Sequence, residues 1–180
     1  MENTLFAPFD TALVIFLSFF TLAIIVLLFW IFVINRKKHV PTQALTEQQK
    51  ANIVCCGLLH FTNQSAVAAI LNDDCIIRPS KDFIYRAEKN YTWFFPATLP
   101  IEESIRRTYE SIKKIRSSAE FCLHITGINE NETHEFLYNP FKNYIAHKGA
   151  LQKTVSVYYL TDGHWMPFDH TNHADVELRE

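Results

Sequence analysis

Glycine is scarce in this chain, at 4 of 180 residues, and neither GxGxxG nor GxxxxGK[S/T] occurs. A glycine-rich phosphate-binding loop is therefore not expected. A positive excess is lacking too, because 17 Lys and Arg residues stand against 19 Asp and Glu. That balance disfavours a dedicated nucleic-acid coat protein, which would be strongly basic. The four cysteines form no C-x-x-C pair, which disfavours a structural zinc site.

Charge is missing altogether from 24 consecutive residues, Thr11 to Ile34. At about 1.5 Å per residue, a helix of this length exceeds the roughly 30 Å hydrocarbon core of a bilayer. Apolar residues cover every face of that helix, which suits lipid better than the core of a soluble domain. A cleaved signal peptide is not expected, because no basic residue precedes the run and the run is too long for a signal sequence. We predict one transmembrane helix over residues 11–34.

Three basic residues follow this segment directly, at positions 36–38. The positive-inside rule then predicts a single-pass protein with its N-terminus outside and its C-terminal domain in the cytoplasm. The expected order is a short extracytoplasmic segment over 1–10, the helix over 11–34, a basic juxtamembrane linker over 35–50 and a domain over 51–180. Three triplets fit the N-glycosylation pattern and point the other way, at Asn63, Asn90 and Asn131. Such triplets often arise by chance, so the charge signal carries more weight.

The domain mixes strand and helix patterns. Apolar runs and alternating residues predict strands over 53–61, 76–77, 91–95, 120–126, 133–138, 144–147 and 154–159. Two helices are expected, over 64–72 behind an Asn63 cap and over 100–117 behind Pro100. The second helix carries an apolar stripe of Ile101, Ile105, Tyr109, Ile112 and Ile115. Helices are too few for a doubly wound parallel sheet, so we predict the α+β class.

Three polar residues end or interrupt apolar strands, and His60 and Glu135 among them are the main candidates for chemistry. His60 and Thr62 close the run Leu58-Leu59-His60-Phe61-Thr62. Glu135 lies among apolar strand residues, where an unpaired carboxylate is costly to bury. Taken singly, each also fits a structural role: His60 as a hydrogen-bonded core imidazole, and Glu135 as a solvated residue on an edge strand.

The order of these motifs resembles that of the ADP-ribosyltransferase-like superfamily. LHFTNQSAVAAIL is similar to the opening strand and helix of bacterial toxins that ADP-ribosylate DNA. HEFLYNPFKNYI resembles the strand that presents the catalytic glutamate in those toxins and in poly-ADP-ribose polymerases. YTWFF lies between them, where the family has an aromatic strand.

This resemblance implies a compact split-sheet domain that uses NAD as a substrate and needs no metal. It implies that Glu135 is the catalytic carboxylate and that His60 is catalytic and ribose-binding. Phe61 and Thr62 would belong to the same NAD-binding strand, and Tyr91 or Trp93 would stack on nicotinamide. The family's tyrosine position falls on Tyr91, Trp93 or Phe94, and the choice stays open.

Together with the predicted anchor, the resemblance implies a membrane-anchored transferase that moves ADP-ribose from NAD to a macromolecular acceptor, or an enzyme that simply hydrolyses NAD, in a toxin, effector or defence role. The acceptor is not encoded in any recognisable motif, and the net charge does not indicate nucleic acid. An alternative is a non-catalytic binding or immunity module on a degenerate version of the same fold. A third interpretation is a metal site near the C-terminus, formed by His164, Asp169, His170 and His173.

Overall fold

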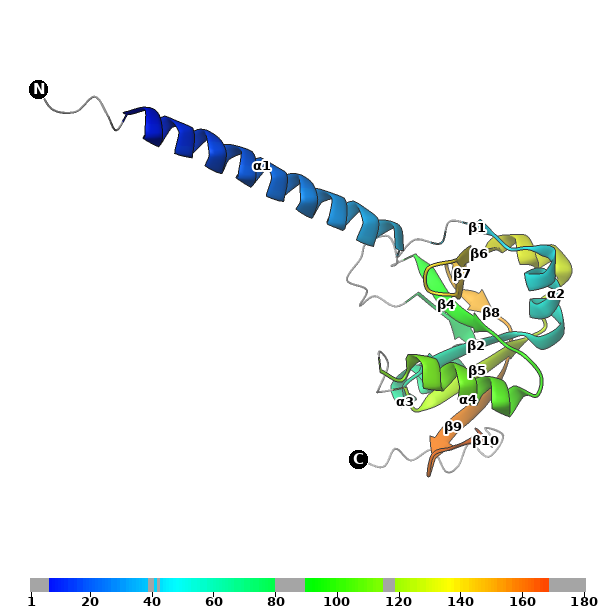
Figure 1. Ribbon diagram of the computed structural model, residues 1–180. Coiled ribbons are helices and arrows are strands. Elements are labelled where there is room, and N and C mark those ends of the chain that lie inside the picture. Colours follow the sequence, from blue (N-terminus) through cyan, green and yellow to red (C-terminus); the bar gives the residue numbers. More distant parts are fainter. Residues whose placement is uncertain (1–6, 39–40, 42, 80–89, 115–118, 169–180) are drawn as a thin grey trace, which may run out of the picture. The chain divides into compact units, whose positions relative to one another are not determined.

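The computed structural model describes residues 7–38, 41, 43–79, 90–114 and 119–168. It divides the chain into two units, 1–39 and 40–180. The first unit consists of α1, Ala7–Lys38. The second unit contains a large antiparallel sheet with helices on both sides, so the α+β class is confirmed (Figure 1).

Helix α1 is long and apolar enough to cross a membrane over Thr11–Ile34, with 24 residues and a mean hydropathy of 3.0. Its apolar side chains are exposed along this segment. The Ser18 and Thr21 hydroxyls donate to the carbonyls of Val14 and Leu17. These two polar groups are thereby satisfied within the helix, as an apolar solvent requires. Membrane anchors and some signal sequences share this length and composition.

The sheet has eight strands in the order β1-β6-β7-β4-β2-β5-β9-β10. Their bounds are β1 Gln43–Ala44, β2 Leu58–Thr62, β4 Tyr91–Pro96, β5 Phe121–Thr126, β6 Phe136–Asn139, β7 Tyr144–Lys148, β9 Thr154–Thr161 and β10 His164–Phe168. Strands β3 Ile76–Ile77 and β8 Leu151–Gln152 pair with each other separately. The domain's helices are α2 Glu47–Cys56, α3 Gln64–Asn72, α4 Ile101–Ile112 and the 3-10 helix η1 Glu130–Glu135.

The large sheet consists of two four-stranded halves joined at β2 and β4. These two strands pair over only two residues, Leu58 with Pro96 and Leu59 with Phe95. By contrast, β2 pairs with β5 along all five of its residues. His60 is therefore the first residue of β2 beyond the junction of the halves.

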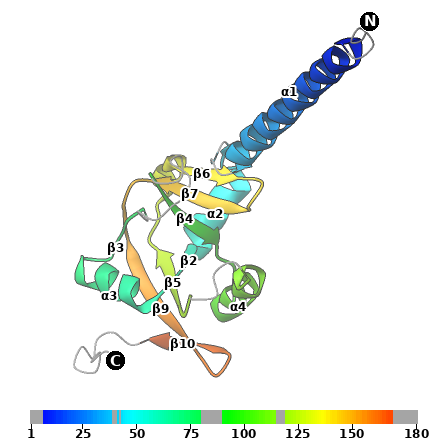
Figure 2. The same cartoon turned by 90° about the vertical axis from the view of Figure 1, so that its left-hand side faces the viewer.

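Alternating side chains form one apolar core on each face of the sheet. The α3 face carries Leu58, Phe94 and Ile145, and α3 packs Val67 and Ile70 into that core. The opposite α4 face carries residues such as Leu59 and Phe61, and α4 contributes Ile101, Ile105 and Ile112. Helices α3 and α4 accordingly lie on opposite sides of the central strands (Figure 2).

Several sequence predictions are confirmed. Asn63 caps α3, because its side-chain oxygen accepts a hydrogen bond from the Ala66 amide. The isoleucine stripe of α4 is buried as expected, whereas Ile115 lies outside the described residues. Five more predicted strands form at or within a few residues of their predicted bounds; they are β3, β4, β5, β7 and β9.

The predicted strand over 53–61 is wrong in its first half. Residues 53–56 belong to α2, which begins at the capping box formed by Thr46 and Gln49. Gly57 ends that helix with a φ of 79° and only then does β2 begin. Residues 53–56 are helical and pair with no strand, and Ile53 is the one buried residue of α2. Residues 43–50, expected as a linker, supply β1 and the first turn of α2.

The predicted strand over 133–138 is wrong at its start. Residues 130–135 form η1, and the strand β6 begins only at Phe136. The Asn129 amide donates to the Glu132 carboxylate at 2.8 Å, which favours a helical turn over an extended segment. Glu135 is therefore the last residue of a 3-10 helix and does not share a strand face with Leu137 and Asn139.

Candidate functional site

His60 is held at the junction of the two half-sheets. Its Nδ1 lies 2.8 Å from the Trp93 carbonyl oxygen, across the junction just beyond the last β2–β4 pair. A carbonyl only accepts, so Nδ1 carries the proton in this contact and a neutral ring keeps Nε2 as an acceptor. The ring is half-buried and packs 5.7 Å from that of Phe94. The imidazole is thus fixed in position and in tautomer.

Phe61 and Thr62 follow His60 along β2. Phe61 points to the α4 face, where its ring meets those of Phe95, Tyr109 and Trp165. It is 1% exposed and is part of the hydrophobic core on that face. Thr62 is half-buried and directly precedes the Asn63 cap of α3.

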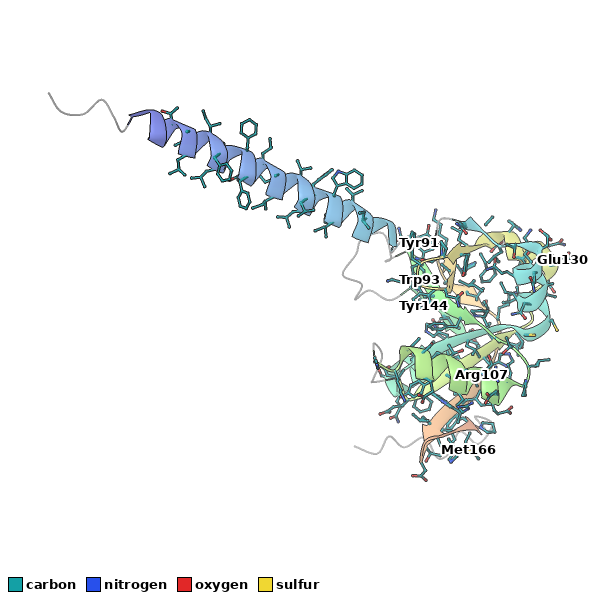
Figure 3. The ribbon with its side chains drawn as sticks, viewed as in Figure 1. Tyr91, Trp93, Arg107, Glu130, Tyr144 and Met166 are labelled. Carbon is teal, nitrogen blue, oxygen red and sulfur yellow. The ribbon has the colours of Figure 1, made fainter. Side chains whose placement is uncertain are left out.

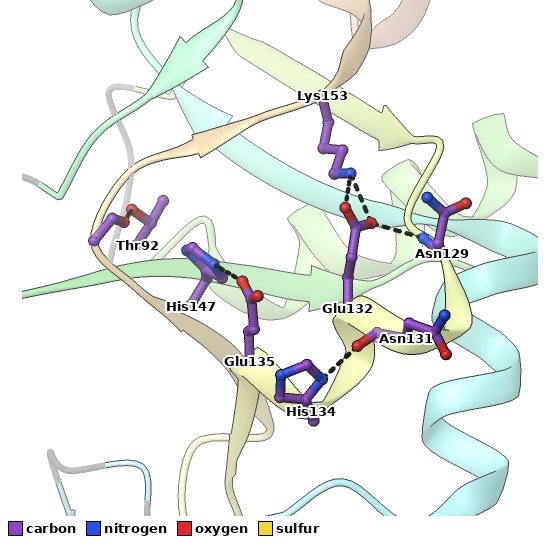
Figure 4. A network of polar contacts seen from close by, with 9 residues as sticks. Thr92, Asn129, Asn131, Glu132, His134, Glu135, His147 and Lys153 are labelled. Atoms are coloured by element: carbon purple, nitrogen blue, oxygen red, sulfur yellow. Dashed lines mark hydrogen bonds and ion pairs between the residues drawn. The ribbon is translucent and has the colours of Figure 1, made fainter.

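Glu135 is the partly exposed end of a carboxylate–imidazole pair. Its Oε2 lies 3.2 Å from Nε2 of His147, which projects from β7 (Figure 4). The Glu135 side chain is 53% exposed, whereas that of His147 is 9% exposed. His147 Nδ1 is buried and has no hydrogen-bond partner among the described residues. The buried imidazole of His147 therefore orients the Glu135 carboxylate, which stays accessible to solvent.

Sequence reasoning did not single out His147. It lies in the strand predicted over 144–147, and its neighbours across the sheet are Thr92 on β4 and Phe136 on β6. The only signal was its alternation with Ile145, which indicates a core-facing position. Proximity to Glu135 comes from the pairing of β6 with β7, which the sequence did not predict.

A second ion pair fixes η1, the helix that ends in Glu135. Lys153 Nζ lies 2.6 and 2.7 Å from the two Glu132 carboxylate oxygens (Figure 4). His134 Nδ1 also bonds to the Asn131 carbonyl within the same helix. The Lys153 hydrogen bond, and next the Asn129 amide, lower the pKa of Glu132 below its usual 4.5. The ionised carboxylate therefore holds η1 against the loop before β9.

We expect acid to destabilise this region in a way that depends on Lys153. Because the folded-state pKa of Glu132 is lowered, its stabilising effect is complete above the unfolded-state pKa and is lost as pH falls below about 4.5. Lys153→Met should lower the melting temperature of the detergent-solubilised chain at pH 7. The further fall in melting temperature between pH 5 and pH 3 should be smaller in the variant than in the wild type. Thermal unfolding at several pH values measures this. Lys148→Met, which removes an exposed lysine, should leave the pH dependence unchanged.

His60 and Glu135 lie on the same face of the sheet. A continuous row of rings joins them on the α3 face: His60 to Phe94 at 5.7 Å, Phe94 to Phe136 at 6.5 Å and Phe136 to His147 at 5.1 Å. Strands β4 and β7 lie between β2, which carries His60, and β6, which follows Glu135 directly.

Tyr91 and Trp93 lie on the opposite face. Tyr91 contacts Trp93 at 6.0 Å, Trp93 contacts Tyr144 at 5.9 Å and Tyr144 contacts Phe95 at 4.7 Å, all on the α4 face. The rings of Tyr91 and Trp93 therefore lie on the other face of the sheet from the His60 ring and Glu135, and only the backbone carbonyl of Trp93 contacts His60. The middle aromatic residue that shares their face is Phe94, which is fully buried.

The structure gives no support to a metal site near the C-terminus among the described residues, or to a cysteine nucleophile at Cys122. His164 begins β10 and is exposed, while Asp169, His170 and His173 lie outside the described residues. Within the described ranges, no three His, Cys, Asp or Glu residues are grouped so as to hold a metal. Burial strongly raises the pKa of the Cys122 thiol, which disfavours a thiolate nucleophile there.

Comparison of the chain with models of known protein families, with curated proteins and with solved structures gives no match.

Proposed function

We propose that this chain is a membrane-anchored ADP-ribosyltransferase-like protein that cleaves NAD and transfers ADP-ribose to a macromolecular acceptor. The observation that carries the proposal is the placement of His60 and Glu135. His60 lies on β2, and Glu135 contacts His147 of β7 on the same α3 face; the rings of Phe94 and Phe136 lie between the two histidines. The resemblance of the motifs around them suggests the reaction.

The chemistry suits a solvent-accessible carboxylate. Cleavage of the bond between nicotinamide and C1′ of the ribose releases neutral nicotinamide and leaves an oxocarbenium-like centre, as in glycoside hydrolysis. The Glu135 carboxylate would stabilise this positive charge and hold a ribose hydroxyl. An acceptor nucleophile, or water, then bonds to C1′ and gives up its proton.

His60 and His147 would have different tasks. His60 would contact the second ribose, with its ring held in place by the contact of Nδ1 with the Trp93 carbonyl. His147 acts through Glu135 as a positioning residue, since its Nε2–H donates to the carboxylate.

A non-catalytic, tethered binding module is the second candidate. The observation that favours it is the location of Tyr91 and Trp93 on the α4 face, away from His60 and Glu135. The corresponding position on the α3 face is Phe94, whose buried ring offers no exposed stacking surface. A degenerate site of this kind would capture a partner protein without consuming NAD.

Release of nicotinamide from NAD by the full chain in detergent distinguishes the two candidates. Multiple turnover supports a transferase or glycohydrolase, and radiolabel from the adenylate half on protein or nucleic acid then identifies the acceptor. A folded sample that neither binds nor consumes NAD would select the binding module. A pulldown under the same conditions would then be expected to yield a stoichiometric partner.

For the anchor, we propose a single span through residues 11–34 with the C-terminal domain in the cytoplasm. The basic residues at 36–38 support this orientation. In a bacterial host, fusion of green fluorescent protein to the C-terminus should give fluorescent cells, and an alkaline phosphatase fusion should be inactive. Active phosphatase would reverse the orientation, and release of a shortened soluble chain would show that the segment is a cleaved signal.

A further inference from the structure

A recess of about 650 Å³ lies on the α4 face, between α4 and the turn that joins β6 to β7. Its volume is within the range of small-molecule binding sites. The wall from the sheet is formed by Phe95 and Tyr144, and the turn adds Phe141 and Lys142. Helix α4 supplies the facing wall, which includes Arg107 (Figure 3).

The sheet wall is aromatic and rigid. The rings of Phe95 and Tyr144 meet nearly at right angles, with centroids 4.7 Å apart and an interplanar angle of 76°. Trp93 supports Tyr144 from the other side at 5.9 Å. Phe141, which is 63% exposed, also lines the recess, so its ring is accessible to a ligand there. Rings held in this way favour a planar aromatic ligand.

Two cationic side chains line the recess. Its described lining includes the cations Arg107 and Lys142 and no carboxylate. Arg107 donates its Nε to Glu103 at 2.6 Å, just outside the lining. A guanidinium has five N–H donors, so this contact leaves the terminal nitrogens able to bind an anion. Hydroxyls of Thr108 and Ser111 on α4 add polar groups between the ring wall and Arg107.

We propose that this recess binds a planar aromatic anion of mononucleotide size, with the ring against Tyr144 and Phe141 and the anionic group at Arg107. The site is distinct from the proposed NAD site, because His60 and Glu135 lie on the opposite face of the sheet. Ligand binding in the recess can therefore be tested independently of NAD cleavage.

The chain offers a matched pair of arginines for the test. Arg106 and Arg107 are neighbours on α4 and both pair with Glu103, but only Arg107 lines the recess. AMP is the probe, titrated calorimetrically into the full chain in detergent. We expect saturable binding that Arg107→Gln weakens about tenfold and that Arg106→Gln changes less than about twofold. Equal effects of the two variants, or no binding of AMP, would overturn the proposal.

Further measurements test whether the aromatic ring contributes to AMP binding and on which face of the sheet AMP binds. Phe141→Ala should weaken AMP about fivefold, whereas Leu99→Ala, an equally exposed apolar residue outside the recess, should have no effect. Ribose 5-phosphate, which lacks the ring, should bind at least about fivefold more weakly than AMP. AMP binding that persists in His60→Ala supports the recess. Loss of binding in that variant would place the ligand on the α3 face and contradict the proposal.

Discussion

Glu135→Gln is expected to lower NAD cleavage by about 10² to 10³-fold and to leave the fold intact. Loss of the negative charge removes the group proposed to stabilise the oxocarbenium-like centre, and a single such electrostatic contact is worth about that factor. The Gln side-chain oxygen can still accept the hydrogen bond that His147 Nε2–H gives to Glu135. Because the side chain is 53% exposed, the melting temperature should change by less than about 2 °C. Nicotinamide release and thermal unfolding are measured on the same preparations.

Glu130→Gln is the matched control for this experiment. Glu130 begins η1, the same helix that Glu135 ends, and its side chain is exposed. The variant removes the same charge from the same helix and should retain full turnover. Wild-type rates in Glu135→Gln would show that another group supports catalysis, and equal losses in both variants would point to a general effect of charge near η1.

Gly57→Ala is expected to give the largest loss of stability of any conservative change in the domain, about 3–5 kcal/mol. A Cβ at this position would lie 2.2 Å from the Ile125 carbonyl oxygen, a backbone atom that cannot move aside. The φ of 79° adds the strain that a non-glycine residue meets in this conformation. A loss of this size is comparable with the total stability of a small domain, about 5–15 kcal/mol, so much of the variant should be unfolded at 37 °C.

Gly163→Ala is the control that measures the backbone strain alone, without the steric clash expected for Gly57→Ala. Gly163 has the same φ of 79°, but nothing lies within 4 Å of the position where its Cβ would be. Its loss should stay near 1 kcal/mol, the usual cost of a non-glycine residue in this conformation. Chemical denaturation of both variants in detergent gives the comparison. Similar losses at the two positions would show that close approach of α2 and β5 is not what requires Gly57.

Gly57 also shows what local patterns could not predict. The run Ile53–Phe61 is apolar throughout, and a strand and a buried helix end are hard to distinguish from periodicity in so short a segment. The deciding contacts are distant in sequence: the Ile125 carbonyl lies against Gly57, and His124 Nε2 bonds to the Cys56 carbonyl at 2.8 Å. Only the packing of β5 against the end of α2 shows why the helix must stop there.

Local composition and spacing were enough to predict several features of this chain. These are the apolar segment 11–34, the cap at Asn63, the buried stripe of α4 and the α+β class, because propensity, capping and burial pattern act over a few neighbouring residues. The same local patterns identified His60 and Glu135 as candidates.

Which side chains share a face of the sheet could be seen only in the folded domain. Sheet order and register place His147 beneath Glu135 and Phe94 in the row with His60, whereas Tyr91 and Trp93 turn to the α4 face. The physical reason is that strand pairing joins segments far apart in the chain, and a shift of one residue in register exchanges the two faces.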